Sequence, residues 1–403
     1  MSSINLAIDR IRAGSICASD ILDRDGRVLI GRGVRLTPEF LQELKNRGFD
    51  SIGVSPQDLQ KLTGGSTVRP KSSNKPLTEN KKFRVDRSSE AISSERHERF
   101  SAQITHSLKL LENLGKDINK GSASAFEAMV ALQSQFVDML MEDTDQSISA
   151  ASSQHTEDVL ASRSAQFAIL SMATAIEMDL TEEDILLCGS CGLLHDIGQY
   201  SFPPYFRDQS QVLTFAETEH YQKHPEISAN ILAKHLVFGD ELCALTLQVH
   251  ELPDGSGYPR GILRNRFHRL TSLVGLVNVY LALVNPTSSR AAMTAYDAIT
   301  LMLLQCRTGL LDSTVMRAFM NQCSLYGLGS KVVLDTGAVA TVVRRDADLY
   351  DQPVVALDDN QADSIIRLRD SGQRIKRAVR NKSHLQVDRS TLNTLCLTEM
   401  LYA

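Results

Sequence analysis

Three histidines stand where their side chains could bind metal ions. His195 directly precedes Asp196, and His224 and His250 follow later in the chain. Imidazole nitrogens and carboxylate oxygens suit Fe, Mn, Zn or Ni, and two such ions side by side could hold a phosphodiester and activate water for its hydrolysis. Taken singly, each histidine is more often structural than a ligand, so this spacing alone does not identify an enzyme.

The segment after His250 carries a longer and more specific motif. It begins with Glu251 and continues as Asp-Gly-Ser-Gly-Tyr-Pro-Arg-Gly over residues 254–261. Together with the Leu-His-Asp-Ile-Gly string around His195, this motif resembles the HD-GYP family, the subset of HD-domain metallohydrolases that opens the bacterial messenger cyclic di-GMP. The resemblance covers about residues 140–325. It implies an all-helical HD fold with a cyclic-dinucleotide pocket.

The resemblance also implies roles for individual residues. The expected metal ligands are His195, Asp196, His224 and His250, and Asp196 is also the expected catalytic residue. The expected ligand-binding residues include Glu251, Asp254, Gly257, Tyr258, Pro259 and Arg260. Arg163 is a further expected ligand-binding residue, because of its charge and not because of the family pattern.

Three ligand positions of the family pattern hold other residues in this chain. Arg163 stands in place of the first histidine, Val249 in place of a histidine beside His250, and Asn278 in place of a late aspartate. Valine has no lone pair, a neutral amide is a weak ligand for a hard cation, and a guanidinium repels a metal ion. Gln199 replaces the lysine that would meet the substrate phosphate. We therefore expect at most one weakly held divalent transition metal (Fe, Mn, Zn or Ni), or none.

These losses favour a degenerate signalling protein over an active enzyme. Arg163 is a good bidentate partner for a phosphate and could hold an anionic ligand without cutting it. We expect binding of cyclic di-GMP or of a protein partner, with little or no turnover. The alternative is an active, metal-dependent cyclic di-GMP phosphodiesterase with a reduced metal site. A scaffold without any small ligand is a third interpretation.

The composition limits the partners and the location. The chain has 403 residues and a net charge of -5, which gives no overall attraction to nucleic acid or to an anionic membrane. The strongly apolar run over 273–284 is shorter than the roughly 20 residues of a membrane span, and the charged N-terminus lacks the apolar core of a signal peptide. We therefore expect a cytoplasmic protein with no nucleic-acid partner and no membrane span, and a homodimer is left open.

The cysteines do not suggest a disulfide framework, because there are seven and they are scattered. Cys188 and Cys191 form one Cys-x-x-Cys pair, for which a zinc or redox role is conceivable. The sequence has no second pair of this kind, and the surrounding residues are apolar with helical spacing. We therefore interpret both cysteines as buried core residues.

Periodicity and the resemblance together predict a mainly α protein. We expect an HD-domain helical bundle with a small α/β N-terminal unit and a small β-rich C-terminal appendage. Helical spacing dominates from about residue 100, and the period changes to two after Gly329. The predicted segments are a small α/β domain (1–56), a flexible basic linker (57–98), a helical HD-GYP domain (99–325), a short β-rich appendage (326–370) and a polar tail (371–403).

Overall fold

The computed structural model divides the chain into two units, residues 1–80 and 81–403. Within the second unit the structure describes residues 93–402, with short gaps. The gaps are 119–122, 154–157, 208–210, 235–238, 347–348, 359–364, 381–383, 386, 388, 393–394 and 396. Within the first unit it describes Leu62 and groups of residues between positions 4 and 54.

The first unit contains a four-stranded antiparallel sheet in the order β1-β4-β2-β3. Its strands are β1 (Ile4–Ala7), β2 (Ile21–Leu22), β3 (Val28–Ile30) and β4 (Ser51–Val54). Helical residues lie between β3 and β4 at positions 41–42 and 44–45. The predicted small α/β unit is therefore present.

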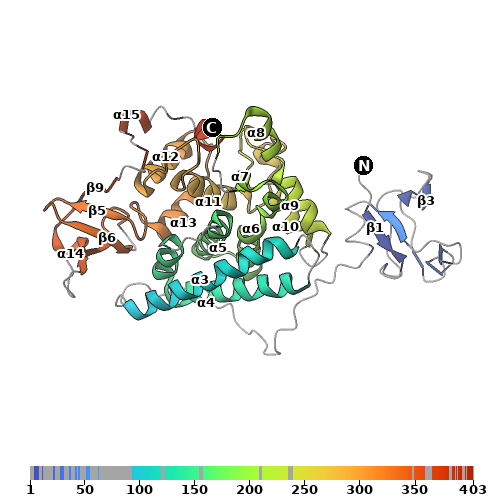
Figure 1. Ribbon diagram of the computed structural model, residues 1–403, viewed down its shortest axis with the longest axis horizontal. Helices are drawn as coiled ribbons and strands as arrows, with labels where there is room; N and C mark the ends of the chain where they lie inside the picture. Colours follow the sequence, from blue (N-terminus) through green and yellow to red (C-terminus); the bar gives the residue numbers. More distant parts are fainter. Residues whose placement is uncertain are drawn as a thin grey trace. The chain divides into compact units, whose positions relative to one another are not determined.

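Helices make up most of the second unit. In chain order they are α3 (Ser94–Ile118), α4 (Ala123–Ser153), α5 (Val159–Glu177), α6 (Glu182–Leu194), η2 (Ile197–Ser201), α7 (Pro204–Arg207), α8 (Phe215–Tyr221), α9 (His224–Ala233), α10 (Gly239–Thr246), η4 (Arg264–Arg266), α11 (Thr271–Val284), α12 (Ala295–Arg307) and α13 (Ser313–Cys323). Helix α5 runs through the middle of this bundle and contacts α3, α4, α6, α11 and α13 (Figure 1). The predicted helical HD bundle is confirmed.

Helix α5 is buried over most of its length because its neighbours surround it. Asp158 caps its start by accepting hydrogen bonds from the backbone N–H groups of Leu160 and Ala161. Among the described helices, α5 is long and apolar enough to cross a membrane, but 89% of its apolar window is buried inside the protein. This burial is what a central core helix requires.

Helix α6 packs very closely on α5 and ends directly at the candidate ligands. Thr181 caps its start by accepting from the backbone N–H of Asp184, and acidic residues fill the first turn. Near its end, Gly192 has no room for a side chain, because a Cβ there would lie 2.5 Å from the backbone nitrogen of Ala168. The close approach of these two helices fixes the position of His195, the residue that ends α6.

A five-stranded antiparallel sheet follows the helices, in the order β8-β7-β6-β5-β9. Its strands are β5 (Lys331–Leu334), β6 (Val339–Arg344), β7 (Val354–Leu357), β8 (Ile365–Arg367) and β9 (Ile375–Ala378), with the short helix α14 (Leu368–Ser371) between the last two. Figure 1 shows this sheet in orange beside α13. The change of period after Gly329 correctly predicts the β-rich appendage.

Two predicted boundaries differ from the structure. Helix α3 begins at Ser94, inside the predicted linker 57–98, because Phe100 and Ile104 already bury one face of it. The predicted polar tail 371–403 contributes β9 to the sheet. Its short helices α15 (Arg389–Leu392) and α16 (Leu397–Tyr402) contact α12 and α11.

Candidate metal centre

His195 and Asp196 lie in the turn between α6 and η2. The Nδ1 atom of His195 lies 3.2 Å from the carbonyl oxygen of Cys191 and 3.3 Å from that of Gly192. Because carbonyl oxygens accept hydrogen bonds, Nδ1 carries the proton and Nε2 keeps its lone pair. Nε2 lies 3.3 Å from Oδ2 of Asp196.

His224 and His250 bring their Nε2 atoms to the same carboxylate. His224 opens α9, and its Nδ1 lies 2.8 Å from the carbonyl oxygen of Tyr221. Its Nε2 lies 2.9 Å from Oδ1 of Asp196 and 3.0 Å from Nε2 of His250. The Nε2 of His250 lies 3.7 Å from Oδ1 of Asp196. The structure therefore brings together all of the ligands that the sequence predicts.

This cluster is almost completely buried: His224 is 0%, His195 and Asp196 are 2%, and His250 is 7% exposed. Burial alone would raise the pKa of the Asp196 carboxyl, but the imidazoles of His195 and His224 outweigh it and hold this pKa well below its ordinary value. Burial is the main cause that lowers the pKa of His250 to about 3. The cluster therefore combines an ionised carboxylate with a neutral imidazole at position 250.

The arrangement suits one metal ion. Oδ1 of Asp196 is buried and receives no hydrogen bond from the residues that the structure describes. Donor atoms of His195, Asp196 and His250 all lie within 4.8 Å of one another. With bonds of about 2.1 Å, two ligand atoms on one ion lie about 3.0–3.4 Å apart, and the distances above fall close to that range.

The loop after His250 closes over the cluster. The backbone N–H of Tyr258 donates to the carbonyl oxygen of His250, and the two rings stack 4.8 Å apart at an angle of 7°. The carboxylate of Glu251 accepts hydrogen bonds from the backbone N–H groups of Arg260 (2.8 Å) and Ile262 (2.9 Å). Glu251 therefore holds the loop in place, and Tyr258 covers one face of His250.

The other loop residues predicted to bind the ligand differ in exposure. Asp254 accepts from the backbone N–H and the hydroxyl of Ser256, and both Asp254 and Arg260 are exposed. A Cβ on Gly257 would lie 2.3 Å from the backbone nitrogen of Leu252, so only glycine fits there. Pro259 follows Tyr258 and is partly exposed.

The comparisons with known proteins match this unit. A family model for the HD domain matches residues 140–315. A cyclic di-GMP phosphodiesterase of Pseudomonas aeruginosa is 28% identical over 176 residues, which cover 44% of this chain and 42% of that protein. A cyclic di-GMP phosphodiesterase of Borreliella burgdorferi is 24% identical over 228 residues, covering 55% of this chain and 59% of that protein.

Residues 140–315 are an HD domain, and their motifs are those of the HD-GYP family.

A third curated relative of this HD-GYP unit has a different nucleotide in its name. It is a 3'3'-cGAMP-specific phosphodiesterase of Vibrio cholerae, 27% identical over 210 residues, which cover 52% of this chain and 46% of that protein. The chain spans about half the length of the curated relatives it matches. Among solved structures, an HDG"Y"P protein from Bdellovibrio bacteriovorus has 15% identity and a TM-score of 0.48, covering 78% of this chain and 97% of that one.

The substituted positions of the HD-GYP pattern have structural neighbours of their own. Arg163 lies on α5 one turn before Phe167, whose ring meets His195 edge-on at 4.5 Å. Arg163 is partly exposed and makes no hydrogen bond or ion pair with any residue that the structure describes. Val249 is 1% exposed and belongs to the apolar core. Gln199 is buried and donates to the hydroxyl of Tyr221 at 3.1 Å.

Asn278 contacts His250 on the side away from Asp196. Its Nδ2 atom lies 3.0 Å from Nδ1 of His250. An amide N–H donated to Nδ1 leaves the imidazole proton on Nε2, the nitrogen that a metal ion would need. An aspartate at this position would accept from Nδ1 and leave the lone pair on Nε2. Asn278 therefore weakens His250 as a ligand even though the geometry of the ring is retained.

Sequence reasoning missed the groups that orient the histidines. The carbonyl oxygens of Cys191, Gly192 and Tyr221 hold the Nδ1 atoms of His195 and His224. Each lies three or four positions before its histidine, a spacing that brings helical residues together.

Cys188 and Cys191 are free and buried, and burial raises the pKa of both thiols. This burial agrees with their interpretation as core residues.

Proposed function

We propose that this chain is a cytoplasmic HD-GYP signalling protein that binds a cyclic dinucleotide and hydrolyses it slowly or not at all. One observation carries the proposal: three histidines converge on Asp196, while Arg163, Val249 and Asn278 occupy further ligand positions of the family without supplying a ligand for a second ion. The named nucleotides of the curated relatives, cyclic di-GMP and 3'3'-cGAMP, support a cyclic dinucleotide as the ligand. The homodimer and the protein partner remain predictions.

His195, Asp196, His224 and His250 would hold one divalent transition metal. When bound, such an ion polarises a phosphoryl oxygen and lowers the pKa of water. The protein's own contribution is to keep Asp196 ionised and to direct the lone pairs of His195 and His224 inward. His250 can join only if its proton moves to Nδ1, where the amide oxygen of Asn278 must then accept it. This requirement explains why the ion would be held weakly.

Burial and charge both argue against rapid turnover. The four ligand residues are at most 7% exposed, so a dinucleotide cannot reach them without movement of the covering loop. The lysine position of the family holds Gln199, which is neutral and already donates to Tyr221. Phosphoryl transfer depends mainly on positioning and on stabilising charge. This site would position the phosphate and stabilise its charge less well than a site with the full family pattern.

Arg163 gives the site a positive charge that does not come from a metal. Its guanidinium has no acidic partner among the described residues, and it lies on the same face of α5 as Phe167, which contacts His195. Guanidinium groups bind phosphates with two parallel hydrogen bonds. We infer that Arg163 binds a phosphate of the ligand and compensates in part for the missing metal charge.

Calorimetry with cyclic di-GMP tests this proposal on the purified full chain. We expect measurable binding by the wild type and a loss of about tenfold or more in affinity for Arg163→Met, because a charged hydrogen bond is removed. Arg317→Met is the matched control, since Arg317 is an exposed arginine on another helix, α13. No binding by the wild type, or unchanged affinity in Arg163→Met, would contradict the proposal.

The alternative, an active phosphodiesterase with a reduced metal site, is favoured by the retained pair of His195 and ionised Asp196. Metal analysis and a hydrolysis assay separate the two functions. We expect no more than one equivalent of metal and little product. Nearly two equivalents of Fe or Mn, with steady hydrolysis that Asp196→Ala abolishes, would establish the enzyme instead.

A further inference from the structure

Helix α4 is interrupted at Asp143, although the helix contains no glycine or proline. Asp143 has φ -159° and ψ 97°, which are extended angles inside an element that runs from Ala123 to Ser153. Those 31 residues contain no glycine and no proline. Helix kinks normally arise at such residues, at π-bulges or where a side chain intrudes. Here the intruding group is the carboxylate of Asp143 itself, and the contacts that fix this carboxylate come from outside the helix as well as from within it.

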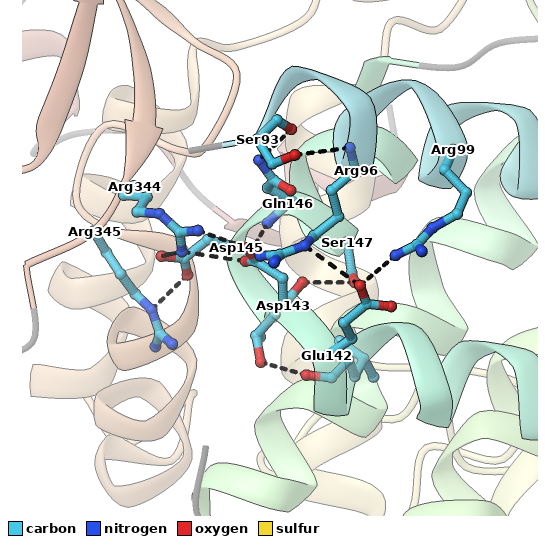
Figure 2. Close-up of polar contacts among 12 residues, drawn as sticks. Ser93, Arg96, Arg99, Glu142, Asp143, Asp145, Gln146, Ser147, Arg344 and Arg345 are labelled. Carbon is cyan, nitrogen blue, oxygen red and sulfur yellow. Dashed lines mark hydrogen bonds and ion pairs between the residues drawn. The ribbon is translucent and has the colours of Figure 1, made fainter. Parts of the chain in front are cut away.

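Two arginines from distant segments hold the carboxylate of Asp143 (Figure 2). Arg344, at the end of β6, donates to both oxygens, at 2.6 and 3.2 Å. Arg96, in the first turn of α3, donates to Oδ2 at 2.8 Å. The same carboxylate also accepts from the backbone N–H of Gln146 at 3.1 Å and so caps the second half of α4. Asp143 itself is only 2% exposed.

A second layer of contacts surrounds this centre. Arg345 donates to Asp145 at 2.7 Å, and both side chains are buried. Gln146 donates through its side chain to the carbonyl oxygen of Ser93 at 3.0 Å, just before α3 begins. Figure 2 shows these groups converging from α3, α4 and the C-terminal sheet. We call the set Arg96, Asp143, Asp145, Arg344 and Arg345 the arginine–aspartate joint.

The arginine–aspartate joint stabilises the interrupted form of α4 over a continuous helix. A continuous helix would pair the backbone N–H groups that follow the break, whereas the first N–H groups of a new helical segment have no partner within it. Asp143, Thr144 and Asp145 have low helix propensities, but residues 140–146 include neither glycine nor proline. The broken form is held by the cap that Asp143 provides and by the arginines that fix its carboxylate. Removing one partner of a buried ion pair leaves the other charge uncompensated.

We propose that α4 is a hinge whose broken form is held by Arg96 and Arg344 together, so that the segment entering α3 is coupled to the C-terminal sheet. The linker predicted before Ser94 leads directly into the turn that carries Arg96. A change that moves Arg96 away removes one hydrogen bond to the carboxylate of Asp143. It thereby weakens the contact of that carboxylate with Arg344, which holds the end of β6. The hinge does not depend on metal or nucleotide binding.

Hydrogen exchange followed by mass spectrometry on the full chain tests the hinge. In Asp143→Ala, the amides of residues 144 and 145 should exchange at a rate that is lower by about tenfold or more, because a continuous helix gives them hydrogen-bond partners. In Arg96→Met, the amides of β6 should exchange faster, because Arg96 and Arg344 share the carboxylate of Asp143. Arg99→Met is the matched control, since Arg99 pairs with the exposed Glu142 and lies over the ring of Phe100, whereas its described contacts do not include Asp143.

Each result decides one part of the proposal. Unchanged or faster exchange at residues 144 and 145 in a folded Asp143→Ala protein would show that core packing sets the break. Exchange of β6 in Arg96→Met equal to that in Arg99→Met would refute the coupling. If Asp143→Ala does not fold, Arg344→Met replaces it, because it frees the carboxylate from its bidentate partner and should also slow exchange after the break.

Discussion

Asn278 decides how well His250 can serve as a ligand, because its side-chain nitrogen lies 3.0 Å from Nδ1 of that histidine. Asn278→Asp should raise metal affinity about 10- to 100-fold, since an aspartate accepts the Nδ1 proton, frees the lone pair on Nε2 and adds a negative charge. Titration of the metal-free protein with Mn²⁺ or Zn²⁺ measures the change. Asn285→Asp, at the end of the same helix, is the control, and an equal gain there would point to a general charge effect.

His250 also predicts how stability depends on pH in the metal-free protein. Its pKa is lowered from 6.5 to about 3, mainly by burial. As the pH falls below 6.5, His250 is protonated in the unfolded chain, whereas in the folded chain it stays neutral until about pH 3. The free energy of unfolding should therefore decrease with falling pH, by up to about 1.4 kcal/mol per pH unit from this group.

Denaturant unfolding of chelator-treated protein between pH 4 and 7 measures this dependence. The variant His250→Gln should show a shallower slope, because it lacks the group whose pKa shifts. His220→Gln, which changes an exposed histidine, should keep the wild-type slope. Equal slopes in all three proteins would show that His250 titrates normally.

The buried Cys-x-x-Cys pair gives a further prediction. Cys188 and Cys191 are both buried, and burial raises the pKa of each thiol, so neither forms the reactive thiolate at neutral pH. Iodoacetamide at pH 8 should leave both unmodified in the native protein and modify both after denaturation. Cys243, which is partly exposed, serves as the internal comparison in the same mass spectrum. Rapid native labelling of the pair would revive the redox interpretation.

At the scale of elements, the contact of α5 with α6 is the one that sets the position of His195. Gly192→Ala would place a Cβ 2.5 Å from the backbone of Ala168, and backbone cannot move aside as a flexible side chain can. We expect a loss of roughly 1–3 kcal/mol or more in the free energy of unfolding, together with weaker metal binding.

A second helical glycine provides the matched control for this substitution. A Cβ on Gly275, in α11, would meet only the carbonyl oxygen of Val249, at an ordinary distance of 3.5 Å. Gly275→Ala should be neutral or should stabilise the protein by about 0.5–1 kcal/mol, as alanine does within a helix. Thermal and denaturant unfolding compare the two variants. Equal effects would mean that the α5–α6 contact is not tight at Gly192.

The elements that the sequence predicts well are those with strong local signals. Thr181 and the acidic residues after it mark the start of α6, and alternating apolar residues mark β5, β6 and β7. Strand β9 escapes prediction because Lys376 and Arg377 interrupt its alternation, and its pairing with β5 supplies what its own residues do not.

The candidate site shows the same division between local and distant information. The motif around His195 and the loop at Tyr258 can be recognised from sequence because their residues are adjacent in the chain. The contact between Asp143 and Arg344 joins positions 201 apart, and no single sequence reveals which buried charges will meet. The role of Glu251 in holding the loop likewise depends on backbone N–H groups, which carry no residue-specific signal.

At the scale of the whole molecule, the apolar residues that the structure describes form two separate cores. One contains Leu6, Ile30 and Leu62 and lies within the first unit. The other begins at Phe100 and extends to Leu397, so that it includes the C-terminal segment as well as the helices. A domain that closes its own core can fold without its neighbour, and this arrangement predicts which truncation the protein tolerates.

A chain of residues 93–403 should fold alone and unfold cooperatively at a temperature close to that of the same transition in the full protein. It keeps Arg96 and the whole of the second core, whereas a chain of residues 105–403 loses Arg96, Phe100 and Ile104 and should be markedly less stable. Calorimetric scans of both chains beside the full protein make the comparison. Insolubility of the 93–403 chain, or a much lower transition temperature, would mean that the second unit needs the first in order to fold. In that case the joint at Asp143 would have to be reinterpreted as part of a larger interface.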